Sequence, residues 1–75
     1  MERSTEYTRA ERKKLLNFIA SGSGPLFVQL INKESEVKDS VHIRKDSVKK
    51  FIKEKGVIYW IFLYDWENQI WVLMN

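Results

Sequence analysis

Hydrophobic residues along the chain recur with two periods, one typical of helices and one typical of strands. The first helical stretch opens with Thr8 and Glu11, which are spaced as in a capping box, so a helix is predicted from this point to about Ala20. Its apolar residues all lie in the second half, which we expect to pack while the basic first half is solvated. The Gly- and Ser-rich segment 21–25 ends this helix and forms a short joint. Residues 1–7 are polar, and we expect them to be frayed.

A second helix is predicted to begin at a cap formed by Asp46 or Ser47 and to end at Lys55, immediately before Gly56. Apolar residues at positions i, i+3 and i+4 form its packing face, which consists of Val48, Phe51 and Ile52. Another face of the same helix carries basic residues, namely Lys45, Lys49 and Lys53, with Lys50 beside them.

Two runs with strand character lie between the helices, separated by a polar loop over residues 32–36. Leu26 to Ile31 is predicted to be the first strand, and Val37 to Arg44, where apolar and polar residues alternate, the second. An antiparallel pairing would place the aliphatic residues of both strands on one face, which consists of Leu26, Val28, Leu30, Val41 and Ile43. The other face would carry Phe27, Gln29, Ile31, Lys38, Ser40, His42 and Arg44.

The C-terminal stretch is predicted to be a hairpin. Val57 to Tyr64 is an unbroken apolar run, residues 65–68 are polar enough for a turn, and Gln69 to Met74 forms the second strand. A turn of two or four residues preserves the parity of the pairing, whereas three residues would move Trp71 to the opposite side. One face is then aliphatic, with Val57, Tyr59, Ile61, Leu63, Ile70, Val72 and Met74. The other is mostly aromatic, with Ile58, Trp60, Phe62, Tyr64, Trp71 and Leu73.

The order α-β-β-α-β-β predicts one compact α+β domain over residues 1–75, with a four-stranded antiparallel sheet and two helices packed mainly on one face. The aliphatic sides of both hairpins would face the helices. The opposite side would expose an aromatic surface, and a monomer rarely leaves such a patch without a use. Four interpretations stay open: the surface is covered by a helix or a bent sheet, it binds protein, it stacks the bases of single-stranded nucleic acid, or it forms a pocket for a small ligand.

Composition and charge narrow the possible functions of the protein. Charged residues make up 31% and hydrophobic ones 44%, which is typical of a globular domain, and there is no cysteine to form a disulfide or to bind a metal. The N-terminal residues do not resemble a signal peptide, and no apolar run is long enough to cross a bilayer as a helix, so we expect a cytoplasmic protein without membrane binding. The net charge of +3 is mild for a nucleic-acid-binding protein.

The candidate chemistry centres on His42, the only histidine. A nucleophilic site needs a serine or cysteine that meets the imidazole, and Ser40 would point the same way from the same strand without meeting it. Asp39 would lie on the opposite face, so a cluster of metal ligands is not expected. We therefore expect neither an enzyme nor a bound metal or cofactor.

The leading hypothesis is a small non-enzymatic protein-interaction module that docks on a larger protein, or on a second copy of itself. Its contact residues would be Trp60, Phe62, Tyr64, Trp71 and Phe27, with His42 and Arg44 at the rim. Small chains without a catalytic set are common among regulators and inhibitors made by phages and mobile elements. The alternative is a nucleic-acid-binding protein that combines aromatic stacking with phosphate contacts from Arg44, Lys45, Lys49, Lys50 and Lys53.

Overall fold

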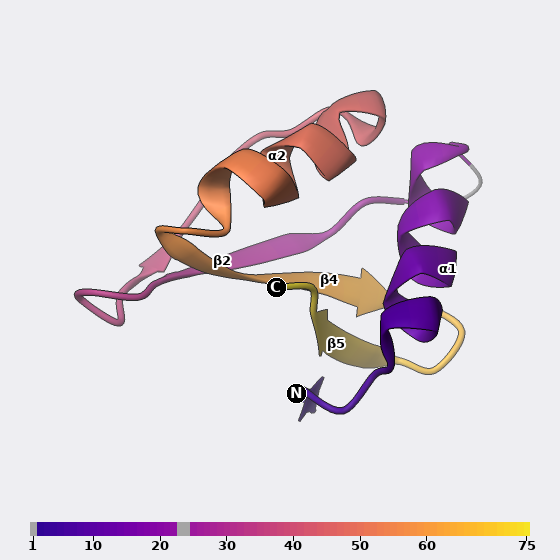
Figure 1. Cartoon of the computed structure of the whole chain (residues 1–75), viewed down its shortest axis with the longest axis horizontal. Helices are drawn as coiled ribbons and strands as arrows, with labels where there is room; N and C mark the ends of the chain where they lie inside the picture. The colour runs from indigo at the N-terminus through magenta and orange to yellow at the C-terminus, as the bar shows by residue number, and fades with distance from the viewer. Residues whose placement is uncertain (1, 23–24) are drawn as a thin grey trace.

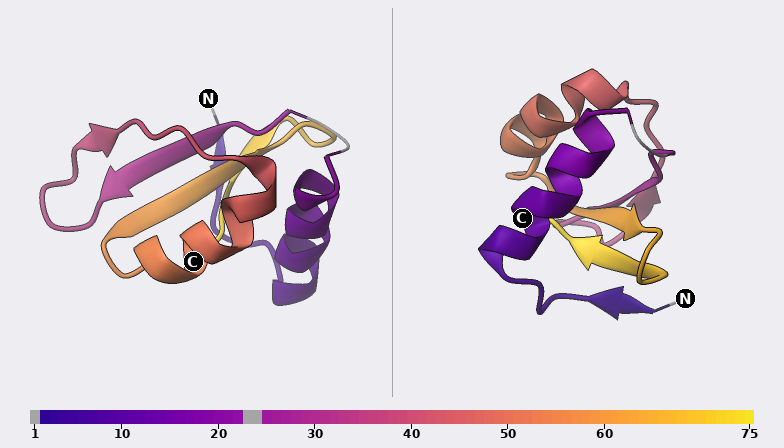
Figure 2. Two further views of the ribbon diagram at one scale, coloured as in Figure 1. Left: turned by 90° about the horizontal axis from the view of Figure 1, so that it is seen from above. Right: turned by 90° about the vertical axis from the view of Figure 1, so that its right-hand side faces the viewer.

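The computed structural model describes residues 2–22 and 25–75. Two helices lie on one side of a mixed sheet (Figures 1 and 2): α1 (Arg9–Ala20) and α2 (Val48–Lys55), the latter preceded by a 3-10 turn, η1 (Lys45–Ser47). The strands are β1 (Arg3–Ser4), β2 (Val28–Asn32), β3 (Lys38–Asp39), β4 (Tyr59–Asp65) and β5 (Ile70–Leu73). Their order is β1-β5-β4-β2-β3, with β1 parallel to β5 and every other pair antiparallel. The predicted α+β class is confirmed, whereas the prediction of four purely antiparallel strands is wrong.

The start of α1 is set locally, as its sequence predicts. Thr8 Oγ1 accepts a hydrogen bond from the Glu11 amide at 3.1 Å, and Glu11 Oε1 accepts one from the Thr8 amide at 2.9 Å, so the predicted capping box is confirmed. The helix ends at Ala20, and the chain turns at Gly22, whose φ of 81° lies in the left-handed region and whose amide donates to the Ile19 carbonyl. Residues 23–24 of the predicted joint lie outside the described residues.

The start of α2 differs from the prediction. The Ser47 side chain makes no capping hydrogen bond, and the turn η1 precedes the helix instead, closed by the Ser47 amide on the Arg44 carbonyl at 3.0 Å. The helix ends at Lys55 as predicted, and a Cβ on the C-cap residue Gly56 would lie 2.6 Å from the Ile52 carbonyl oxygen. Gly56 is therefore required by close packing rather than by an unusual φ, which is −63°.

The β4–β5 hairpin has the parity predicted for a four-residue turn, but the turn covers residues 66–69 rather than the predicted 65–68. Tyr64 pairs with Trp71 and Leu63 with Val72, so aromatic and aliphatic side chains separate onto opposite faces. The turn is closed by Gln69, whose φ of 54° lies in the left-handed region. The first strand begins at Tyr59 rather than at residue 57, because residues 56–58 form the turn that follows α2.

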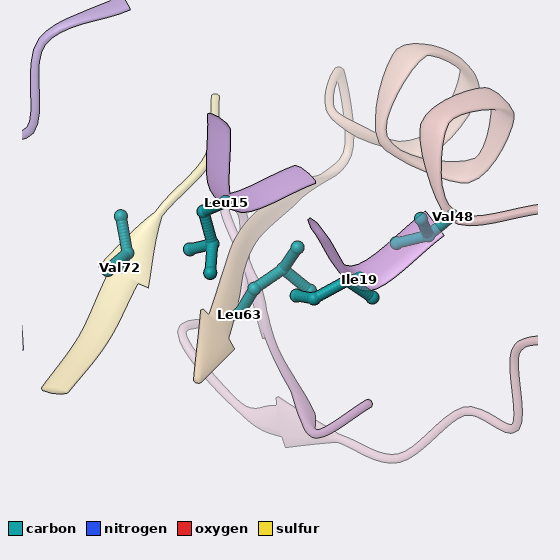
Figure 3. Close-up of a cluster of buried hydrophobic side chains, with 5 residues drawn as sticks. All are labelled: Leu15, Ile19, Val48, Leu63 and Val72. Carbon is teal, nitrogen blue, oxygen red and sulfur yellow. The ribbon is translucent and has the colours of Figure 1, made fainter. Parts of the chain in front are cut away.

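The core lies between the two helices and the aliphatic side of the sheet. Figure 3 shows Leu15 and Ile19 of α1 directed toward Leu63 of β4, with Val48 of α2 and Val72 of β5 completing the cluster. Ile19 is 2% exposed, and Val48, Leu63 and Val72 are completely buried. Complete burial of such a side chain stabilises the fold by about 1.5–3 kcal/mol, so this cluster is the main reason that both helices lie on one face.

The predicted strand over residues 37–44 is wrong beyond Asp39. Only Lys38 and Asp39 pair, with Ile31 and Leu30 respectively, so residues 40–44 leave the sheet. These residues form the connection from the edge of the sheet to α2, which begins beside the C-terminal end of α1 (Figure 1). Alternating polarity alone therefore did not make a strand here, because residues 40–44 have no neighbouring strand to pair with.

The N-terminal residues that were expected to be frayed form an edge strand instead. Arg3 pairs with Trp71 and Ser4 with Val72 in parallel, and the Trp71 amide donates to the Glu2 carbonyl at 3.1 Å. Met1 lies outside the described residues. The prediction that this segment is frayed is therefore wrong for Arg3 and Ser4. The strand lies next to β5 and places Arg3 on the same side of the sheet as Trp71.

Candidate functional site

The side of the sheet opposite to the helices is the candidate functional site, and we call it the aromatic face. The strand register places its central side chains on this side, and they are Gln29, Ile31, Trp60, Phe62, Tyr64 and Trp71. Phe27 extends this face, since the Tyr64 amide donates to the Phe27 carbonyl at 3.1 Å and continues the pairing of β2 with β4. The predicted aromatic members are therefore brought together by neighbouring strands.

Exposure divides these residues into two groups. Phe62 and Trp71 are each only 7% exposed, although neither helix covers this side of the sheet. Trp60 and Phe27 are 41% and 47% exposed. The first pair therefore supports the face from within, while the second pair is available to a partner.

Strand β1 supplies much of the cover over Phe62. The Arg3 guanidinium lies 4.9 Å from the centroid of the Phe62 ring, and its Nη2 donates to Gln29 Oε1 at 3.0 Å. Gln29 is itself buried, so this hydrogen bond satisfies an amide oxygen that would otherwise lack a partner. The sequence contains no signal for this contact, because it depends on a parallel pairing between the two ends of the chain.

Trp66 is a member of the site that the sequence reasoning missed. It lies in the β4–β5 turn, and its ring centroid is 4.8 Å from that of Tyr64 and 5.3 Å from that of Phe27. Tyr64 in turn contacts Trp71 edge to face at 5.1 Å. An aromatic residue within an otherwise polar turn was the signal, because such a side chain seldom remains in water when apolar surface lies beside it.

Lys33 is a second missed member. Its Nζ lies 4.2 Å from the centroid of the Trp60 ring and donates to the Gly56 carbonyl at 2.7 Å. The lysine therefore holds a positive charge over Trp60, which is one of the exposed rings of the face. Such cation–π contacts contribute about 0.5–1 kcal/mol at exposed sites.

Charge is sorted between the two sides of the sheet. Within the described strands, Arg3 and Lys38 share the side of the aromatic rings, because they pair with Trp71 and Ile31. Asp39 and Asp65 lie on the helix side, because they pair with Leu30 and Ile70. The strand residues therefore give the aromatic face positive charge and no negative charge.

Neither of the two predicted rim residues reaches this face. His42 and Arg44 lie outside the sheet and are exposed. Arg44 instead immediately precedes η1, forms a solvent-exposed ion pair with Asp46 at 3.4 Å, and lines a shallow hollow beside Ala20 of α1. The expectation that they form the rim followed from the strand wrongly predicted over residues 40–44.

The lysines of the nucleic-acid hypothesis lie on a different part of the molecule. Lys49, Lys50 and Lys53 are exposed on α2, which packs on the opposite side of the sheet, and Lys45 lies in η1 before it (Figure 2). Lys50 is paired with Glu54 at 3.9 Å. The structure therefore does not combine these lysines and the aromatic rings in one surface.

The described residues contain no group of three or more His, Cys, Asp or Glu side chains placed to hold a metal ion. Across the same part of the chain, no helix has the length and apolar character needed to cross a membrane. The site thus consists of exposed rings, flanking cations and a buried supporting layer. Comparison of the chain with protein-family models, with curated proteins and with solved structures gives no significant match.

Proposed function

We propose that the protein is a non-enzymatic interaction module that docks on an acidic surface of a larger protein through the aromatic face. The observation that carries this proposal is the combination of exposed Trp60 and Phe27 with flanking positive charge from Lys33 and Lys38. Aromatic side chains with nearby cations are typical of the energetically dominant residues in protein interfaces. Complementary carboxylates on the partner would steer the encounter and fix the orientation.

The arrangement of the rings favours a protein over single-stranded nucleic acid. Base stacking needs free ring faces in a basic groove. Here Arg3 lies over Phe62 and Lys33 lies over Trp60, so the protein's own cations already lie over these two rings. The lysines of α2, which would contact phosphates, lie on the other side of the sheet.

Charge also favours a different partner over a second copy of the chain. A symmetric dimer through the aromatic face would bring Arg3, Lys33 and Lys38 of both copies together, and like charges at an interface are unfavourable. A module of this kind acts by occupying the surface of another protein. The small size of the chain favours a role as a regulator or inhibitor of a larger assembly.

The test begins with immobilised protein and an extract of the source cells. A captured protein is identified, purified and measured by calorimetry against wild type and Trp60→Ala. Loss of an interface Trp typically costs about 2 kcal/mol or more, so we expect the Kd to rise about 30-fold. Lys38→Glu should also weaken binding, and the wild-type Kd should rise with salt concentration.

The matched control is Phe18→Ala, which removes an exposed ring from α1 on the opposite side of the sheet. This variant should bind the partner with the wild-type Kd. An unchanged Kd for Trp60→Ala would overturn the proposal. Binding of a single-stranded oligonucleotide that Trp60→Ala abolishes would favour the nucleic-acid function, and a dimer that dissociates in Trp60→Ala would favour self-association.

A further inference from the structure

A groove of about 590 Å³ separates α1 from the β4–β5 turn. Cavities of roughly 300–1,000 Å³ are the usual size for small-molecule sites. Its lining is mainly apolar and includes four aromatic residues, which are Tyr7, Phe18, Tyr64 and Trp66. Phe18 and Trp66 are each about half exposed, so they stand at the opening rather than in the core.

The charge of this lining is opposite to that of the whole protein. Glu11, Asp65 and Glu67 line the groove, and Lys14 is the one basic residue among the described residues that do so. Three carboxylates against one ammonium leave an excess of negative charge, in a chain whose net charge is +3. The excess of carboxylates would attract a positively charged ligand to the groove.

Asp65 holds a buried negative charge in the wall of this groove. It is 7% exposed, and its Oδ2 accepts hydrogen bonds from the Tyr7 hydroxyl at 2.6 Å and from Asn68 Nδ2 at 3.0 Å. Its Oδ1 accepts from the amides of Glu67 and Asn68 at 3.0 and 3.3 Å. All four donors are neutral, and the ion pairs within residues 2–22 and 25–75 do not include Asp65.

The carboxylate stays ionised despite its burial. Burial raises the pKa of Asp65, but the hydrogen bonds from Tyr7, from the Asn68 side chain and from the two backbone amides outweigh it and lower the pKa below its ordinary value. A carboxylate has about four lone-pair positions, and four donors already occupy those of Asp65. Asp65 thus supplies negative charge without a free hydrogen-bond acceptor.

This combination selects among organic cations. A primary ammonium or a guanidinium ion brings N–H donors that need acceptors when they leave water, and the buried Asp65 has none to offer. Glu11 and Glu67 keep free oxygens, but both are exposed, so a cation paired with them remains in contact with water. A quaternary ammonium ion has no N–H group, is attracted by carboxylate charge, and binds against aromatic rings. We propose that the groove between α1 and the β4–β5 turn binds a quaternary ammonium group.

Two sources share this chemistry: a free small molecule such as choline, and a trimethylated lysine in a peptide. We would titrate ¹⁵N-labelled protein with choline and, separately, with a short peptide that contains N-trimethyllysine, and follow the amide shifts of Asn68 and Phe18. Saturable shifts of these residues by either probe are expected, and the tighter probe identifies the source. Sodium chloride at equal ionic strength controls for screening.

The neutral isostere of choline, 3,3-dimethylbutan-1-ol, isolates the charge and should bind about tenfold more weakly or not at all. Phe18→Ala and Glu67→Gln, both at exposed positions, should each weaken binding of the cation. Trp60→Ala is the matched control, since Trp60 does not line the groove, and should bind as wild type does. The proposal would be overturned if the isostere bound as tightly as choline, or if neither cation gave a saturable shift. It would also be overturned if Trp60→Ala weakened binding as much as Phe18→Ala or Glu67→Gln.

The test of the groove can fail without affecting the test of the aromatic face, and the reverse is also true. The quaternary ammonium site is tested by Phe18→Ala with Trp60→Ala as control, and the partner surface by the same two variants with their roles exchanged. A failure at one site therefore leaves the other test intact.

Discussion

The hydrogen bond from Tyr7 to Asp65 offers the sharpest test of the electrostatics. The change Tyr7→Phe removes the hydroxyl and keeps the half-buried ring, which packs against the core. Burial and the contact with Asp65 raise the pKa of Tyr7, so the hydroxyl is protonated and donates at neutral pH. The variant leaves Asp65 buried with three donors in place of four.

The expected loss of stability follows from the charge of the acceptor. At 2.6 Å this is a short, charge-assisted hydrogen bond, a class that contributes about 1.5–3 kcal/mol. In a domain of this length, 1 kcal/mol shifts the Tm by about 4–8 °C. We therefore expect Tyr7→Phe to lower the free energy of unfolding by about 1.5–3 kcal/mol near neutral pH, with a Tm lower by about 6 °C or more.

The effect should depend on pH with a definite sign. Because the pKa of Asp65 is lowered in the folded state, its contribution to stability is complete above the unfolded pKa of about 3.9 and disappears as the pH falls through the lower, folded value. Losing the Tyr7 donor moves the folded pKa of Asp65 upward. The difference between wild type and Tyr7→Phe should thus be constant from neutral pH down to about 5, and it should shrink below about 4.

The assay is urea unfolding at a series of pH values, followed by tryptophan fluorescence. Tyr64→Phe is the matched control, since it removes the same group from a half-buried tyrosine whose ring makes aromatic contacts. A loss in Tyr7→Phe no larger than in Tyr64→Phe would refute the reasoning. So would a difference that stays constant to the lowest pH at which the protein folds.

Two further predictions concern backbone packing and the N-terminal strand. Gly56→Ala should lower the free energy of unfolding by about 1–3 kcal/mol, because the added Cβ would lie 2.6 Å from the Ile52 carbonyl oxygen. Urea unfolding measures this loss, and a stability equal to that of wild type would show that the turn adjusts freely. Arg3→Ala should lower the free energy of unfolding by about 1–2 kcal/mol, because it removes the contacts with Gln29 and Phe62. It should also speed hydrogen exchange of the Trp71 amide, which donates to the Glu2 carbonyl, and unchanged exchange would contradict the pairing of β1 with β5.

The sequence by itself determined the features that depend on neighbouring residues. Thr8 and Glu11 meet within one helical turn, so their spacing was enough to place the start of α1. The period of two along β4 and β5, with an even number of turn residues, was enough to place Trp71 on the same face as Tyr64 and Val72 on the same face as Leu63. These are local rules, and the aromatic face follows from them.

Tertiary structure alone decided how much of that face is available. Residues at the two ends of the chain meet when β1 pairs with β5, and this pairing places Arg3 over Phe62. Parallel strands are not joined by a short turn, so the sequence contains no local signal for their pairing. The entropy lost in closing the long loop between them is offset only by contacts that form in the complete fold. The position of His42 was also decided by the tertiary structure. Its alternating neighbours resemble a strand, but the path of the chain from β3 to α2 places it outside the sheet.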